Sequence, residues 1–330
     1  MAFEATFPLK DIGLLTDIII GKSDFNVALN DIPKQYVNGA IYSGKKLRCT
    51  LQYGRKVNRG GYGSIYRCSR TPSVGKDVCV KTPHNPAHSM CPEAILQSIA
   101  CHTLEVAGIV GAIPHIYDIF QYAGETRFCM EYIEGMNVVD AVLKATDPDT
   151  VWMQILGQVS LILGFLEENI QLDHRDLKAD NLWVRPTPVD YSITLGGVTW
   201  HIEAPFQVVI LDFGFACLGE NGNAVVSLSD GILPAIDPCP KEGRDLFQLI
   251  ASMWSIPSVR ERAGEAVTLE MNSLLDSKGK SYMELVHKTL DVHWIYLAVS
   301  NPTFQYPSLH PIALLQKLSR DWSDVGIHTK

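Results

Sequence analysis

The most informative segment of the sequence is His174-Arg175-Asp176-Leu177-Lys178-Ala179-Asp180-Asn181. It places Asp176 five residues before Asn181. A carboxylate that can accept a hydroxyl proton, followed by an amide that can hold a metal ion, suits phosphoryl transfer, because the protein's part in that reaction is mainly to position groups and supply charge. The spacing therefore predicts a catalytic loop rather than an ordinary turn.

Downstream, a second carboxylate ends an apolar strand in Val209-Ile210-Leu211-Asp212-Phe213-Gly214. From the end of a strand, Asp212 can bridge Mg²⁺ to phosphate oxygens. Asp-Phe-Gly alone is a weak signal that is typical of ordinary turns, so its weight comes from its place after the catalytic-loop segment. Further on, Arg244-Asp245-Leu246-Phe247 begins an apolar run.

Upstream, two runs are typical of phosphate-binding strands. Asn58-Arg59-Gly60-Gly61-Tyr62-Gly63-Ser64-Ile65-Tyr66 follows a strand, glycine turn, strand pattern. Its glycines let backbone N–H groups approach phosphate oxygens, although a lone glycine loop is more often a plain hairpin. Val78-Cys79-Val80-Lys81 is a β-branched run that ends in lysine, and a helix predicted from Pro92 carries Glu93 in its first turn.

In this order, the motifs resemble those of the eukaryotic-type protein kinases. Each motif has an ordinary explanation when taken alone, so it is the order that carries the resemblance, over roughly residues 51–255. A lysine two positions after the aspartate, here Lys178 after Asp176, resembles the pattern of serine/threonine kinases rather than that of tyrosine kinases. The sequence lacks Ala-Pro-Glu between Gly214 and Asp245 and in this respect resembles the divergent kinases of large DNA viruses. This leaves the mode of peptide docking open.

The resemblance implies a role for each charged residue of the two downstream motifs. Asp176 would be the catalytic base, and Lys178 would neutralise the γ-phosphate. Asn181 and Asp212 would hold Mg²⁺, with Mn²⁺ as the alternative ion. Asp245 would brace the catalytic loop.

The same resemblance implies an ATP site. Lys81 would contact the α- and β-phosphates and pair with Glu93, with Glu105 as the rival partner. The residues expected to contact ATP are Val57, Asn58, Gly60, Gly61, Gly63, Ile65, Cys79, Lys81, Met130, Glu131, Ile133, Asn137 and Trp183. Asn58 stands where the family has its first glycine, so we expect weakened rather than lost nucleotide binding. Trp183 stands where the family usually has leucine, and we expect its bulky ring to narrow the site.

The implied fold is α+β and bilobal, a protein-kinase-like fold with a small antiparallel β-lobe and a larger, mainly helical lobe. We expect an N-terminal extension at 1–50, an N-lobe at 51–135 and a C-lobe at 136–330. An insertion at about 190–203 reads as a β-hairpin, because two alternating runs flank Gly196-Gly197, and we expect it to project as a flap.

Composition limits the partners. The formal net charge of −8 argues against a dedicated nucleic-acid binder. A local group of basic residues reads as a solvated edge before the phosphate-binding loop, with a nucleic-acid patch as the alternative; it comprises Lys45, Lys46, Arg48, Arg55, Lys56 and Arg59. The apolar run 151–166 is interrupted by polar residues and predicts a buried helix, so no membrane partner is expected.

Eight cysteines form no C-x-x-C pair and no zinc-type cluster. They predict a reduced, intracellular protein, located in the cytoplasm or, if viral, in the host cytoplasm or the virion. Ser227 and Ser229 are candidate phosphorylation sites that Arg175 could bind.

The sequence thus favours a serine/threonine protein kinase that transfers the γ-phosphate of Mg-ATP to a protein substrate. Two alternatives stay open. One is a pseudokinase scaffold, and the other is a small-molecule kinase similar to aminoglycoside and choline kinases, which often lack Ala-Pro-Glu.

Overall fold

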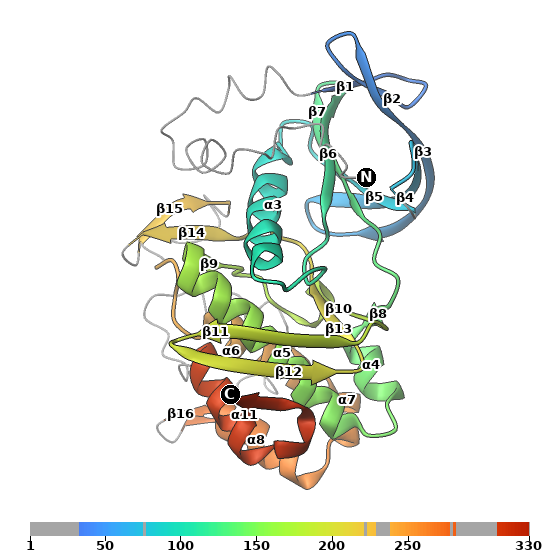
Figure 1. The fold of residues 1–330 in the computed structure, drawn as a ribbon. Coiled ribbons are helices and arrows are strands. Elements are labelled where there is room, and N and C mark those ends of the chain that lie inside the picture. Colours follow the sequence, from blue (N-terminus) through green and yellow to red (C-terminus); the bar gives the residue numbers. More distant parts are fainter. Residues whose placement is uncertain are drawn as a thin grey trace. The chain divides into compact units, whose positions relative to one another are not determined.

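The computed structural model describes residues 33–74, 77–220, 223–228, 238–277, 280–281 and 309–329. The chain has mixed α/β content and divides into two compact units (Figure 1). The first comprises Met1–His102 and Ile113–Ile133, and the second comprises Thr103–Ala112 and Glu134–Lys330. The division after Ile133 lies beside the boundary expected at 135. The bilobal kinase fold itself stays a prediction.

The first unit is a closed barrel of seven strands in the order β1-β2-β3-β4-β5-β7-β6. Neighbours pair antiparallel, except that β1 closes the barrel by pairing parallel with β6. Closure matters because it leaves no unpaired sheet edge. The strands are β1 Lys34–Gln35, β2 Ala40–Ser43, β3 Lys46–Arg59, β4 Gly63–Thr71, β5 Val78–Pro83, β6 Ile116–Tyr122 and β7 Glu125–Glu131.

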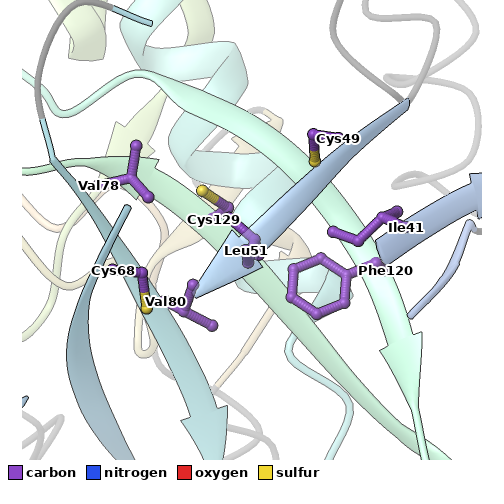
Figure 2. Packing of buried hydrophobic residues seen from close by; sticks show 8 residues of the cluster. All are labelled: Ile41, Cys49, Leu51, Cys68, Val78, Val80, Phe120 and Cys129. Carbon is purple, nitrogen blue, oxygen red and sulfur yellow. The ribbon is translucent and has the colours of Figure 1, made fainter. Parts of the chain in front are cut away.

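The barrel interior is filled by alternate residues of these strands, as the two-residue period of a strand requires. Figure 2 shows the buried cluster of Ile41, Cys49, Leu51, Cys68, Val78, Val80, Phe120 and Cys129. Burial raises the pKa of the Cys129 thiol well above its usual value. This thiol therefore packs as a small, unreactive hydrophobe.

One ion pair is buried with this cluster. Arg70 donates from Nε to Asp118 Oδ2 at 2.8 Å and from Nη1 to the carbonyl of Pro72 at 2.8 Å. Both side chains are almost completely buried. A charge in such a place is tolerated only because its partner is present.

The expected N-terminal extension needs correction. Residues 34–50 do not extend from the β-lobe, because β1, β2 and the start of β3 lie within them and complete the barrel. Sequence inspection placed the first strand at Leu51, whereas β3 starts at Lys46. Its first residues are exposed, so they lack the apolar alternation that marks a strand. Residues 1–32 of the expected extension lie outside the described residues.

The second unit is built mainly from helices. These are α4 Val138–Lys144, α5 Pro148–Ile170, α6 Arg244–Trp254, α7 Pro257–Arg262, α8 Glu265–Leu275 and α11 Pro311–Asp321, with the 3₁₀ helices η1 Ala179–Asn181 and η2 Ser323–Val325. Helix α3 Cys91–Val106 starts in the first unit and ends in the second. Short strands form three-stranded sheets here. One consists of β13 Gln207–Ile210, β10 Leu182–Arg185 and β8 Met136–Asn137, and another of β15 Asn223–Ser227, β14 Cys217–Glu220 and β9 Leu172–Asp173. In addition, β16 Asp276–Ser277 pairs with β17 Lys280–Ser281.

Helix α5 forms the core of this unit. Asp147 caps its start by accepting from the Thr150 N–H at 3.1 Å, and Gln171 ends it in a left-handed conformation. By length and composition α5 could cross a membrane, and it is the helix in the described part of the chain that passes this test. Because 78% of its most apolar window is buried inside the structure, α5 is accounted for as a core helix.

The hairpin in the insertion is present as β11 Val189–Leu195 and β12 Val198–Ala204, with Gly196 and Gly197 both at positive φ in the turn. It does not project as the expected flap. One face is buried against α5, with Trp200 fully buried, and β12 also pairs with β18 Ile327–Thr329. The hairpin packs its apolar face against α5, which shields that face from water.

The cysteines also differ from the expectation of a fully reduced chain. Cys217 and Cys239 form a disulfide, whereas the other six are free and buried. The pair was not visible in the sequence because its members are 22 positions apart, and only the fold brings β14 beside the segment before α6.

Two acidic partners of the barrel's arginines, Asp118 and Asp77, should respond differently to truncation. We expect Asp118→Ala to lower the free energy of unfolding by about 3–5 kcal/mol, because it leaves the Arg70 guanidinium buried without its counter-ion. Asp77→Ala, which breaks the more exposed pair with Arg67, should cost less than about 1 kcal/mol. Urea denaturation followed by circular dichroism measures both, and equal losses would contradict the assignment of Asp118 to the interior.

Candidate active site

Asp245, in the first turn of α6, holds the catalytic-loop segment in place through hydrogen bonds. Its carboxylate accepts from the backbone N–H of His174 at 2.7 Å and of Arg175 at 2.8 Å. Arg175 adopts a positive φ of 64°, so the chain turns sharply there and both N–H groups point at one carboxylate. Burial, together with the charge of Asp173, raises the pKa of Asp245 well above its usual value.

A buried ion pair supports this brace. Arg244 donates from Nε to Asp173 Oδ2 at 3.0 Å and from Nη2 at 2.5 Å, and both side chains are almost fully buried. Burial alone would raise the pKa of Asp173, but the guanidinium and the hydrogen bonds outweigh it and lower that pKa. Sequence inspection missed this pair. The signal was an aspartate directly between Leu172 and His174.

His174 joins the loop to the strand that leads to Asp212. The ring is fully buried, and burial lowers its pKa, so the neutral form is favoured. Nδ1 accepts from the backbone N–H of Asp176 at 3.3 Å, and Nε2 donates to the carbonyl of Leu211 at 3.0 Å. The ring also packs against Phe213, with centroids 5.0 Å apart. The histidine therefore acts as a structural link.

Asp176, Lys178 and Asn181 lie together. Lys178 Nζ lies 2.8 Å from Asp176 Oδ2, and Asn181 Nδ2 donates to the carbonyl of Asp176 at 2.7 Å and to Oδ2 at 3.1 Å. The Asp176 side chain is 11% exposed, whereas the Lys178 side chain is 29% exposed. A buried carboxylate is thus fixed beside a cation that still reaches solvent.

Asp212 follows directly on this group. The Leu211 N–H donates to the carbonyl of Asn181 at 2.9 Å, which brings the two predicted metal ligands onto adjacent backbone. Asp212 has a positive φ of 64°, and its Oδ1 accepts from the Gly214 N–H at 3.3 Å. Asn181 uses Nδ2 for Asp176, so its Oδ1 is not engaged in that contact. Amide and carboxylate oxygens are the ligands that Mg²⁺ prefers, so the two residues fit the ion.

In the first unit, Lys81 pairs with Glu93 rather than with the rival Glu105. The distance from Lys81 Nζ to Glu93 Oε1 is 2.5 Å, and both side chains are more than nine-tenths buried. Lys81 lies directly opposite Ile65 on the neighbouring strand, and so beside the glycine-rich turn. A buried lysine whose charge is matched by one glutamate is held in place by it.

The glycine-rich turn is compact. The Gly60 N–H donates to the carbonyl of Gly63 at 2.9 Å, and a Cβ on Gly63 would come within 2.6 Å of the Thr82 carbonyl oxygen, which explains the glycine there. Asn58, the departure from the family pattern, uses its side chain to accept from the Arg59 N–H at 2.7 Å. It therefore stabilises the strand end locally.

Most of the other residues predicted to contact ATP lie on strands, whereas Ile133 follows the end of β7 and is buried. In the first unit, Cys79 is directly opposite Met130, which neighbours Glu131 on β7. In the second unit, Asn137 is opposite Trp183. The Asn137 side chain caps α4 by accepting from the Val139 N–H at 2.8 Å and donates to the Ala179 carbonyl at 2.9 Å, so it has a structural role. Its contact with ATP stays a prediction.

Arg175 reaches one of the two candidate phosphorylation sites. Its Nη1 donates to Ser227 Oγ at 2.7 Å, with the guanidinium almost fully buried. Ser229 lies outside the described residues, as does the Leu233-Pro234-Ala235 stretch in the region where Ala-Pro-Glu was sought.

Ser252, which sequence inspection also missed, accepts from the Ala179 N–H at 3.1 Å.

Comparisons with known proteins give partial matches. No protein-family model matches the chain. Over 185 residues, 55% of this chain, it is 28% identical to a probable serine/threonine-protein kinase, zyg-1, of Caenorhabditis briggsae. Over 106 residues, 32% of this chain, it is 20% identical to the probable kinase 098L of Invertebrate iridescent virus 3. The chain spans 23% and 20% of the lengths of these relatives, and its relationship to them is kinase-like.

The brace by Asp245 is testable. We expect Asp245→Ala to leave two buried N–H groups unpaired, each at a cost of about 1–3 kcal/mol, and to speed amide exchange at His174 and Arg175. Asp245→Asn keeps one oxygen acceptor and should lose about half as much stability. Urea denaturation and hydrogen exchange measure the two effects. Unchanged exchange at both amides in the alanine variant would disprove the brace.

Proposed function

We propose that the protein is a serine/threonine protein kinase that transfers the γ-phosphate of Mg-ATP to protein hydroxyls, and that it adopts the bilobal kinase fold. The observation that carries the proposal is the grouping of Asp176, Lys178 and Asn181, with Asp212 on the adjacent backbone. Its support comes from the kinase-like relationship to two proteins that are themselves described as probable kinases.

Each side chain has a task that its surroundings suit. Asp176 would take the proton of the attacking hydroxyl, because its carboxylate is fixed by Asn181 and is an acceptor when ionised. Lys178 would move from Asp176 to the γ-phosphate, since its ammonium group is partly exposed and flexible. Positioning of this kind is the protein's main contribution to phosphoryl transfer.

Asn181 and Asp212 would hold Mg²⁺, which neutralises charge on the phosphates when bound. Lys81 would contact the α- and β-phosphates, with Glu93 fixing its ammonium group. The presence of all these charged groups favours an enzyme over a pseudokinase scaffold. The Arg-Asp-Leu-Lys run after His174 favours a protein acceptor over a small molecule.

Replacing the catalytic base separates turnover from binding. We expect Asp176→Asn to bind ATP nearly as well as the unaltered protein and to transfer phosphate about 10²–10⁴ times more slowly, because a general base of this kind contributes that factor. The matched control is Asp180→Asn, an exposed carboxylate of the same segment, which should keep its activity. Radiolabelled transfer to generic acidic and basic proteins is the assay. Full activity of Asp176→Asn refutes the proposed role.

Removing a metal ligand should act on binding as well. We expect Asp212→Ala to weaken Mg²⁺-dependent ATP binding at least about tenfold, because a carboxylate that bridges ion and phosphates is lost. Isothermal titration with Mg-ATP, with Asp190→Ala as the exposed control, measures the effect. If binding of ATP is equally strong in the variant, the metal assignment is wrong. If the unaltered protein binds ATP but transfers nothing, the scaffold alternative replaces the enzyme.

A further inference from the structure

The acidic chain contains one segment that is purely basic. Residues 33–74 hold nine of the 28 Lys and Arg residues and none of the 36 Asp and Glu residues. The segment forms strands β1 to β4 and thus more than half of the barrel. The net charge of −8 therefore conceals a strongly positive face, which charged partners would meet locally.

Most of these cations are available to a partner. Arg67 pairs with Asp77 and Arg70 with the buried Asp118. Within the described part of the chain, five others are exposed and make no ion pair; they are Lys34, Lys45, Lys46, Arg55 and Arg59. A natural surface usually intersperses both signs, so an uncompensated group of this size favours an anionic partner.

A cavity opens beside these strands. It has a volume of about 420 Å³, and its wall includes the rings of Tyr36, Tyr53, Tyr66 and Tyr122 with Gln35 and Arg127. Tyr36 is 56% exposed and Tyr53 is 39% exposed, so aromatic surface faces solvent here. Cavities of this size hold small planar ligands.

The cavity is not the proposed ATP site. Successive residues of a strand point to opposite faces of the sheet. Tyr66 lines the cavity and its neighbour Ile65 was assigned to ATP, while Thr82 lines the cavity and its neighbour Lys81 pairs with Glu93. The tyrosine-lined cavity therefore lies on the other face of β4 and β5.

The rings and the cations are already arranged together. The Arg127 guanidinium is ion-paired with Glu125 at 2.6 Å, lies 4.5 Å from the Tyr122 ring centroid and donates to the Tyr53 hydroxyl at 3.4 Å. Lys56 Nζ lies 5.9 Å from the Tyr66 ring centroid. Planar rings stack on nucleobases, and Lys and Arg bind phosphates. The buried Gln35 holds the Tyr53 ring in place, because its Oε1 accepts from the Tyr53 hydroxyl at 3.2 Å. An acidic polypeptide would use the cations but would leave the rings without a partner.

We propose that this face of the barrel binds single-stranded nucleic acid, with a base in the tyrosine-lined cavity and the backbone phosphates along the basic strands. The site is separate from catalysis and does not depend on the proposed kinase activity. Sequence analysis kept such a patch as the less favoured alternative, because the net charge of the chain concealed it.

The test is fluorescence anisotropy with labelled twelve-residue oligouridylate and oligothymidylate, at several salt concentrations and in the presence of Mg-ATP. We expect saturable binding of one or both, which distinguishes RNA from DNA. A plot of log affinity against log salt concentration has a negative slope. Lys34→Glu with Arg55→Glu should make that slope less negative by about 1.4, as the loss of two phosphate contacts on a single strand predicts. Lys144→Glu with Arg262→Glu, which reverses two exposed charges of the second unit, should leave the slope unchanged.

The rings are tested separately. Tyr36→Ala should weaken binding about tenfold, whereas Tyr36→Phe, which keeps the ring, should bind like the unaltered protein. Absence of saturable binding overturns the proposal, and so do equal effects of the two charge-reversal pairs. If polyglutamate displaces the oligonucleotide at equal charge concentration and Tyr36→Ala has no effect, the face is a binding site for acidic polypeptides instead.

Discussion

The candidate active site depends on one carboxylate, that of Asp245, which accepts the two backbone N–H groups at the start of the catalytic-loop segment. Through these two bonds α6 sets the path of the chain into Asp176. His174 then passes the constraint on, because one ring nitrogen bonds the Asp176 backbone and the other bonds Leu211, next to Asp212. The positions of the charged groups thus follow from buried polar contacts that do no chemistry themselves.

Sequence inspection predicted the elements that follow from short-range pattern. The strand of Lys81, the helix of Glu93, the long apolar helix and the hairpin around Gly196 all lie where periodicity and turn residues placed them. The catalytic-loop and Asp-Phe-Gly segments could be interpreted for the same reason, since their meaning lies in spacing along the chain. Asp176, Lys178 and Asn181 are indeed in mutual contact.

What sequence inspection missed depends on contacts between distant segments. Lys34 meets β6 only because the barrel closes, and the exposed start of β3 has no alternation to announce it. The disulfide, the pair of Asp173 with Arg244 and the structural use of Asn137 likewise depend on which elements become neighbours. Net charge misled in a similar way, because a sum over the whole chain carries no information about where in the fold the charges lie.

The sheet of β11, β12 and β18 has a consequence for how this sequence can vary. Residues 190–203 read as a removable insertion, yet their buried face covers α5 and their edge pairs with Ile327–Thr329. Losing the hairpin would strip the cover from the core helix and leave β18 without a partner strand. A deletion in the hairpin would therefore also disturb Ile327–Thr329, more than 120 positions further along the chain.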